Sequence, residues 1–213
     1  MSRSAAFLFS FLLVSMFSFG QDWKLRTDKN GIRVYSKQVP GSRINALRVE
    51  SDFAASASQL VAVILDINTS TDWLYSTKSA TLLKTVSPAE VYYYSEVSFP
   101  WPASNRDFVA HIKVNQNPAT KVVNVHAENV AALVPEKPGI VRVKQSIGNW
   151  YITPLDRNHI HVQYELQVDP AGALPAWLVN MLSTKGPFES FKNLRTQLER
   201  PVYASARFNF IAD

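Results

Sequence analysis

The chain has 213 residues, with 22 Lys or Arg, 17 Asp or Glu and no cysteine. Without cysteine there are no disulfide bonds and no thiol for lipid attachment, so stability must come from a buried core. The modest positive charge includes no block of Lys or Arg; it gives little support to a nucleic-acid role and suits either an anionic membrane surface or simple solubility.

The N-terminal residues have the pattern of a secretory signal peptide. Arg3 precedes an apolar run from Ala5 to Phe19, which Gly20 closes. The run falls short of the roughly 20 apolar residues that a membrane-spanning helix needs. We therefore predict that residues 1–20 are a cleaved signal peptide and that the protein is secreted or periplasmic. An uncleaved anchor is the alternative, because Phe19 is not the small residue usual at a cleavage site.

Two strands and a helix are expected at the start of the remaining domain, residues 21–200. Gly31–Gln38 and Asn45–Phe53 alternate apolar and polar residues on either side of a turn, which predicts an antiparallel pair. Apolar residues at helical spacing follow Ser56 and Ser58, either of which can cap a helix, and continue to about Asp66.

The following residues indicate antiparallel strands joined by short turns. Together with the first pair they predict about eight or nine strands in one sheet. The connection Glu128–Gly139 differs, because it carries apolar residues and two prolines, and apolar residues on a loop need a partner. The predicted strand segments are Ser79–Val86, Glu90–Phe99, Arg106–Asn115, Lys121–Asn129, Gly139–Leu155 and His159–Val168.

The C-terminal segment predicts one long amphipathic helix with an interruption. Apolar residues recur at helical spacing from Leu174 to Leu198. Gly186 and Pro187 interrupt this stretch, and because proline removes a backbone donor we expect a bend or flexible joint there. Residues 201–213 carry no pattern that places them and are expected to form a tail.

A single helix cannot cover the predicted sheet. A helix is about 10–12 Å across, whereas neighbouring strands lie about 4.8 Å apart. The sheet must therefore curl around the helix. Such a curl either packs solid or encloses a space, and periodicity alone does not choose between the two.

The stretch VYYYSEVSFPWPASNRDFVAHIKV resembles the central signature of the steroidogenic acute regulatory protein-related lipid transfer (START) domains. In that signature an aromatic-rich strand and a proline-containing turn lead to an Arg-Asp-Phe triplet. The resemblance continues in the same order through GIRVYSKQVPGSRINALRVE, DINTSTDWL, PEKPGIVRVKQSIGNWYITPL and DPAGALPAWLVN, and covers about Trp23 to Leu198.

The resemblance implies an α+β helix-grip fold, in which a curved antiparallel sheet wraps a long C-terminal helix and leaves an internal hydrophobic cavity for one lipid. It also implies a lid made by that helix and a loop between two middle strands. The loop residues Leu133 and Val134, with Gly186 and Pro187, are then the predicted gate. The predicted cavity residues are Arg106, Phe108, Ala110, Ile112, Tyr93, Trp177, Leu178, Met181, Leu182 and Phe188.

Arg106 has two possible roles. Strand alternation places it with Phe108 and Ile112 on the apolar face of the strand. It either locks the preceding turn, together with Trp101 and Asp107, or meets a lipid head group in the cavity. The first role is favoured because a buried guanidinium without partners costs several kcal/mol and a turn supplies partners. Sterol-binding family members carry a second arginine where this chain has Ile112, which puts sterol specificity in doubt.

Signatures of catalysis are missing from the sequence. His159 and His161 have a spacing that can bind zinc, but no third ligand is evident, and nucleophile-elbow and phosphate-loop motifs are absent. We predict no metal, no cofactor and no catalytic residues. The expected protein is a monomer that binds and transfers a lipid or other hydrophobic small molecule, touches membranes transiently and binds no nucleic acid. A cyclase-like or hydratase-like enzyme and a non-transferring ligand sensor are the alternatives.

Overall fold

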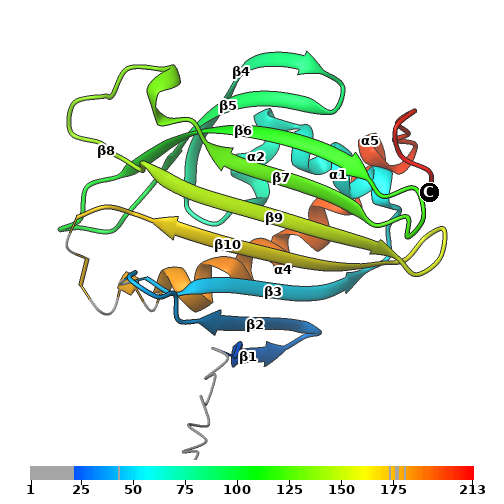
Figure 1. Cartoon of the computed structure of the whole chain (residues 1–213), viewed down its shortest axis with the longest axis horizontal. Helices are drawn as coiled ribbons and strands as arrows, with labels where there is room; N and C mark the ends of the chain where they lie inside the picture. The colour runs from blue at the N-terminus through cyan, green and yellow to red at the C-terminus, as the bar shows by residue number, and fades with distance from the viewer. Residues whose placement is uncertain (1–21, 43, 173, 176–177, 180) are drawn as a thin grey trace, which may run out of the picture.

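The computed structural model describes residues 22–42, 44–172, 174–175, 178–179 and 181–213 (Figure 1). The predicted signal peptide, residues 1–20, and Trp177 lie outside the described residues. None of the helices in the described part of the chain is long and apolar enough to cross a membrane.

One ten-stranded sheet forms the body of the protein. The strand order is β1-β2-β3-β10-β9-β7-β6-β5-β4, and these neighbours are antiparallel, while the short β8 runs parallel to β6. The antiparallel sheet and C-terminal helix confirm the predicted fold class. Strand β1 was not predicted, and the predicted strand Gly139–Leu155 is divided into β8 and β9, because β8 pairs with β6 instead of continuing β9. The strands are β1 (Lys24–Lys29), β2 (Ile32–Lys37), β3 (Ala46–Phe53), β4 (Thr77–Ser87), β5 (Glu90–Val97), β6 (Arg106–Gln116), β7 (Val123–Asn129), β8 (Val141–Arg142), β9 (Gln145–Pro154) and β10 (Ile160–Asp169).

Short helices connect and cover the strands. Ser56 caps the first of them in a capping box with Gln59, which settles the choice between Ser56 and Ser58. The helices are α1 (Ala57–Leu65), η1 (Ile67–Thr69), α2 (Ser70–Trp73), η2 (Ala131–Leu133), η3 (Met181–Lys185), α4 (Gly186–Leu198) and α5 (Pro201–Ala204).

Helix α4 lies against the concave side of the sheet, behind β10 and β3 in the view of Figure 1. Phe191 and Leu194 of α4 are completely buried, and the Phe191 ring stacks parallel on Trp150 of β9 with 5.6 Å between the ring centroids. Trp73 of α2 meets the same Trp150 ring edge-on at 6.1 Å. This end of the concave side is therefore a solid aromatic and aliphatic core.

The helical winding changes at Gly186 and Pro187, where a joint was predicted, although the backbone stays helical through Lys185. The turn before them, η3, is π-helical, and Pro187 occupies the first turn of α4. A proline here lacks the N–H that would continue the hydrogen-bond ladder from the preceding turn. The predicted single helix therefore consists of two differently wound segments.

The C-terminal residues pack back onto the domain. Tyr203 and Ile211 are buried in the main core. The Tyr203 hydroxyl donates to Asp66 Oδ2 at 2.8 Å, and the Ser58 N–H donates to Asp213 Oδ1 at the start of α1. Residues 201–213, expected only as a tail, thus contribute core and cap groups to the domain.

Candidate ligand-binding cavity

A cavity of about 500 Å³ lies between the concave face of the sheet and the segment that precedes α4. Its volume falls within the range of about 300–1,000 Å³ that is usual for small-molecule sites. The sequence left open whether the space between sheet and helix is solid or hollow. The structure shows both: α4 fills one end of the concave side, and the cavity occupies the other end.

The cavity wall is predominantly apolar. Side chains at the ends of β3, β5, β6 and β10 form one side, and the chain before α4 forms the other. The apolar wall residues on the strands are Leu47, Val97, Phe108, Leu166 and Val168, those on the adjoining connections are Ile44, Phe99, Val143 and Pro170, and those on the C-terminal segment are Leu174, Val179 and Leu182.

A few polar groups also line the cavity. Ser36 on β2 accepts a hydrogen bond from Arg26 Nε at 2.7 Å, and Ser183 and Thr184 come from η3. The charged groups in the wall are Arg26 and Arg106. An apolar hollow with a few convergent polar groups can hold an amphiphile by its tail and orient it by its head.

Arg106 makes the structural contacts of the first role that was weighed for it, and it also lines the cavity. Its Nε donates to the Pro170 carbonyl at 3.1 Å, and its two terminal nitrogens donate to the carbonyls of Ser104 at 2.5 Å and Ala171 at 3.1 Å. The guanidinium also lies over the Phe99 ring, 4.6 Å from its centroid. These contacts join the turn before β6, through Ser104, to the chain that follows β10, through Pro170 and Ala171. The same arginine lines the cavity. Burial lowers the pKa of this guanidinium.

The turn before β6 is held by Asn105 rather than by Trp101. The Asn105 amide donates to Glu96 at 2.7 Å and its oxygen accepts the Phe99 N–H at 3.1 Å. The Glu96 carboxylate also pairs with Lys78 at 2.8 Å, and these bonds from Lys78 and then Asn105 hold its pKa below the ordinary value. The predicted turn residue Trp101 is 90% exposed and packs against nothing that would fix the turn.

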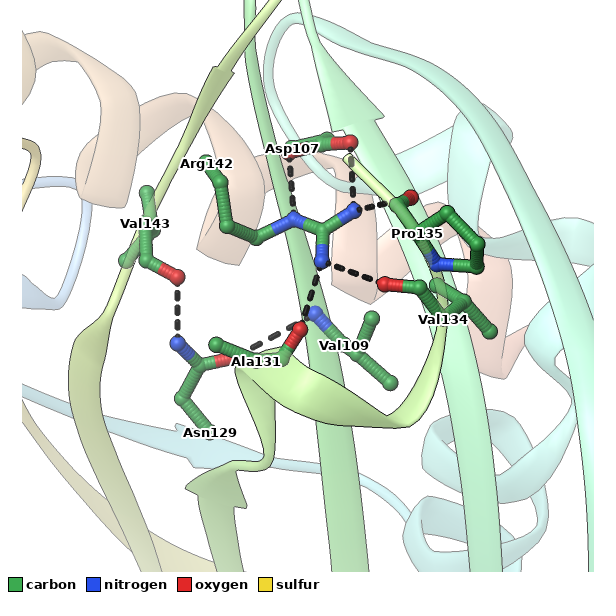
Figure 2. A network of polar contacts seen from close by, with 8 residues as sticks. All are labelled: Asp107, Val109, Asn129, Ala131, Val134, Pro135, Arg142 and Val143. Atoms are coloured by element: carbon green, nitrogen blue, oxygen red, sulfur yellow. Dashed lines mark hydrogen bonds and ion pairs between the residues drawn. The ribbon is translucent and has the colours of Figure 1, made fainter. Parts of the chain in front are cut away.

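Asp107 points to the opposite face of β6 and forms a buried ion pair that the sequence did not reveal. Both of its carboxylate oxygens accept from Arg142, at 2.7 and 3.1 Å. Figure 2 shows that the same guanidinium also reaches the carbonyls of Ala131, Val134 and Pro135. Arg142 therefore fastens the loop after β7 onto the outer face of β6. The hydrogen bond to Asp107 raises the pKa of Arg142.

The loop predicted as part of the gate lies over that outer face. Leu133 is 51% exposed and Val134 is half-buried, and neither is among the residues that line the cavity. Asn129, at the start of the loop, donates a hydrogen bond to the carbonyl of Val143, which follows β8 and contributes to the cavity wall. The structure does not bring Leu133 and Val134 together with the other predicted gate residues.

The remaining predicted cavity residues separate into groups. Arg106, Phe108 and Leu182 line the cavity. Ile112 belongs to the solid core, and Ala110 is buried on the same strand.

The other predicted cavity residues within the described part of the chain do not line the cavity wall. The Tyr93 ring packs edge-on against Phe108, with 5.8 Å between the ring centroids. On the C-terminal segment, Leu178 is fully buried and Phe188 packs against the core. Trp177 and the side chain of Met181 lie outside the described residues.

Sequence reasoning missed two arginines that matter to the site, Arg26 and Arg142. Arg26 lies on the edge strand β1, whose burial pattern has no regular alternation. Arg142 ends the two-residue strand β8, inside the segment predicted as one strand, and only its pairing with Asp107, 35 residues away, reveals its role. The one signal available was the acidic residue in the Arg-Asp-Phe triplet, since a buried carboxylate needs a cationic or N–H partner.

A curved antiparallel sheet gripping a C-terminal helix, with an internal apolar cavity beside it, defines the helix-grip class. A family model for the START domain matches residues 15–202, and the chain belongs to this family. An uncharacterized protein of Pseudomonas aeruginosa is 31% identical over 84% of this chain and 88% of its own length. The mouse phosphatidylcholine transfer protein is 28% identical over 78% of this chain and 79% of its own.

A solved structure agrees with the sequence matches. The crystal structure of the STAR-related lipid transfer protein from Xanthomonas axonopodis, a fragment spanning residues 25–204, is 34% identical to this chain. The similarity covers 84% of this chain and 99% of that one, with a TM-score of 0.77.

Proposed function

We propose that the protein binds one lipid or other hydrophobic molecule in this cavity and exchanges it with membranes. The observation that carries the proposal is the apolar cavity of about 500 Å³ between sheet and C-terminal segment. Membership of the START family and similarity to proteins named for lipid transfer support the same conclusion.

Hydrophobic transfer energies favour a carrier over a tight binder. Each buried CH₂ is worth about 0.8 kcal/mol relative to water, so an acyl chain gains on the order of 10 kcal/mol by leaving solvent. A bilayer offers nearly the same gain. The free energy of transferring the lipid between bilayer and cavity is therefore close to zero. The protein acts by keeping the acyl chain out of water while the lipid is away from the membrane.

The C-terminal segment is the proposed gate. Leu174, Val179 and Leu182 line the cavity before the interruption, whereas Phe191 and Leu194, beyond it, are fixed in the solid core. Bending at the interruption would move the cavity wall and leave α4 in place. Apart from Leu178, which is fully buried, the residues of this segment before the interruption whose burial is described are partly buried or exposed. A less buried segment beside a change in the helix opens at lower free energy than the packed core does.

We further propose that the protein is secreted or periplasmic and that Trp101 contacts the membrane. The exposed Trp101 lies on the turn between Phe99 and Arg106, both of which line the cavity, so it is next to the cavity wall. Tryptophan side chains favour the membrane–water interface. Insertion of this turn would place the cavity beside the bilayer that supplies the ligand.

The decisive experiment identifies what the protein carries. The purified protein is analysed by native and lipid mass spectrometry, and its transfer of fluorescent lipid between liposomes is measured. A bound hydrophobic molecule that exchanges unchanged supports the proposal. A bound molecule that is chemically converted indicates an enzyme, binding without exchange indicates a sensor, and a protein that binds no hydrophobic molecule contradicts the proposal.

Membrane contact has its own test. Trp101→Ala is expected to slow exchange between liposomes several-fold while leaving the affinity for a soluble fluorescent fatty acid unchanged. Leu155→Ala is the control, because Leu155 is also exposed but lies on the turn between β9 and β10, at the other end of the sheet (Figure 1). Equal exchange rates for the two variants would rule out Trp101 as the contact.

A further inference from the structure

The charged side chains that line the cavity are all cationic. Of its described wall residues, Arg26 and Arg106 carry a charge, and both are positive. The structure describes every Asp and Glu of the chain, and neither arginine forms an ion pair with any of them. The cavity therefore holds positive charge that no carboxylate of the protein neutralises.

Arg106 is the more informative of the two because it is only 5% exposed. A buried cation is unfavourable unless an anion or hydrogen-bond acceptors compensate for lost water. Three main-chain carbonyls accept from Arg106, but carbonyls are neutral and leave its net charge in place. Arg142, the buried arginine on the neighbouring strand β8, is compensated differently. Both carboxylate oxygens of Asp107 accept hydrogen bonds from it, so its charge is neutralised.

Arg106 also retains unused donors. A guanidinium has five N–H groups, and three of those on Arg106 are directed at the carbonyls of Ser104, Pro170 and Ala171. The other two N–H groups have no hydrogen-bond acceptor among the described residues, and Arg106 lines the cavity wall. Arg26, at the exposed rim, uses its Nε on Ser36 and has its terminal nitrogens free of ion pairs. Guanidinium groups bind carboxylates and phosphates preferentially.

We propose that the cavity selects amphiphiles with an anionic head group, a carboxylate or a phosphate, which binds Arg106 inside the wall and Arg26 at the rim while the tail lies among Leu47, Phe108 and Leu182. This inference rests on the proposed function, because it assigns the head-group chemistry of the ligand in the same cavity. It also explains why a turn-locking arginine faces the cavity instead of solvent.

The test compares probes that share one tail and differ in head-group charge. Dodecanoate, dodecyl phosphate, dodecanol and dodecyltrimethylammonium each displace a fluorescent reporter from the delipidated protein, below their micelle-forming concentrations. We expect at least one anion to bind about ten- to a hundredfold more tightly than dodecanol, as a charge-assisted bond in a buried site allows, and dodecyltrimethylammonium to bind most weakly. The ratio of dodecanoate to dodecyl phosphate distinguishes a fatty acid from a phosphate head group.

Arg106→Gln should remove the preference for the anions while leaving the affinity for dodecanol unchanged, and Arg106→Lys should retain part of it. Arg26→Gln should reduce the preference by a smaller factor. Arg33→Gln, on the outer face of the neighbouring β2, makes the same change in net charge and is the control. If Arg106→Gln fails to fold, two other results test the inference. One is the difference in anion preference between Arg26→Gln and Arg33→Gln, and the other is the order in which the unmodified protein binds the four probes.

The possible outcomes separate this inference from the proposed function. If the unmodified protein binds dodecanol or dodecyltrimethylammonium as tightly as the anions, the inference is wrong and the cavity still binds lipid. If no probe binds, the proposed function itself fails. A preference for anions that disappears at high salt would place the selectivity on exposed charge and overturn the assignment to buried Arg106, since buried pairs are screened much less.

Discussion

Adjacent residues on β6 serve opposite faces of the sheet. Arg106 points into the concave side and binds three carbonyls at the cavity wall, while Asp107 points outward and holds Arg142. Strand geometry requires this division, because successive side chains alternate between the two faces. One dipeptide therefore orders both the cavity wall and the loop that covers the outer face.

Breaking the buried pair should destabilise the fold strongly. Arg142→Met leaves the Asp107 carboxylate uncompensated and three loop carbonyls without their donor, so we expect a loss of about 3–5 kcal/mol in the free energy of unfolding. Urea unfolding followed by circular dichroism measures it. The control, Arg200→Met, breaks an exposed pair with Asp72 and should lose less than about 1 kcal/mol. Equal losses would show that the buried pair has no special role.

Glu96 makes stability depend on pH in the acidic range. Its hydrogen bonds to Lys78 and Asn105 hold its folded pKa below the ordinary value of 4.5. The stabilisation is therefore fully present above about pH 4.5 and is lost as pH falls through the folded pKa. Glu96→Gln should reduce stability by about 1 kcal/mol at pH 7, because a neutral acceptor replaces a charged one.

The pH series provides the check on Glu96. The difference in urea midpoint between the two proteins should shrink when the pH is lowered from 5 to 3. A difference that stays constant across this range would mean that the carboxylate charge does not contribute.

At the scale of elements, one half of the C-terminal segment is packed in the core and the other half, the proposed gate, borders the cavity. Helix α4 packs Phe191 and Leu194 into the core, whereas η3 and the residues before it border the cavity. The two halves meet at Gly186 and Pro187, where the backbone ladder lacks a donor. Local opening is therefore expected on the cavity side of this joint.

Pro187→Ala should make the segment more continuous and slow the gate. Alanine restores the N–H and favours the helix, so we expect slower lipid exchange between liposomes with unchanged equilibrium affinity, and a small gain in thermal stability. Pro201→Ala is the matched control, because Pro201 also begins a helix but lies outside the cavity wall. An exchange rate unaffected by Pro187→Ala would contradict the joint as the rate-limiting element.

At the scale of the whole molecule, the concave side is packed at one end and hollow at the other. The packed end must hold the sheet in its curve without help from the hollow end. The C-terminal residues contribute to it, since Tyr203 and Ile211 enter the core from the far end of the chain. The last residues of the chain therefore add core contacts at the packed end, which the cavity end cannot supply.

Ile211→Ala should therefore be costly although it lies two residues from the end of the chain. We expect a loss of about 2–4 kcal/mol from the cavity it leaves in the core. Val202→Ala removes side-chain atoms from a residue that is 69% exposed, and should change stability by no more than about 0.5 kcal/mol. Thermal or urea unfolding of both variants measures the difference, and equal stabilities would mean that the C-terminal residues are not part of the folding unit.

The sequence by itself determined the local features of this protein: strand alternation, a serine cap at Ser56 or Ser58, the change in the helix at Pro187 and the family signature around Arg106. Each depends on residues close together in the chain, where period and backbone chemistry act directly. Only the tertiary structure decided that the interior is solid at one end and hollow at the other, that Arg142 meets Asp107, that Leu133 does not line the cavity and that Arg26 reaches its rim. These features depend on side chains brought together from distant segments, and alternation shows which face a residue occupies but not what packs against that face.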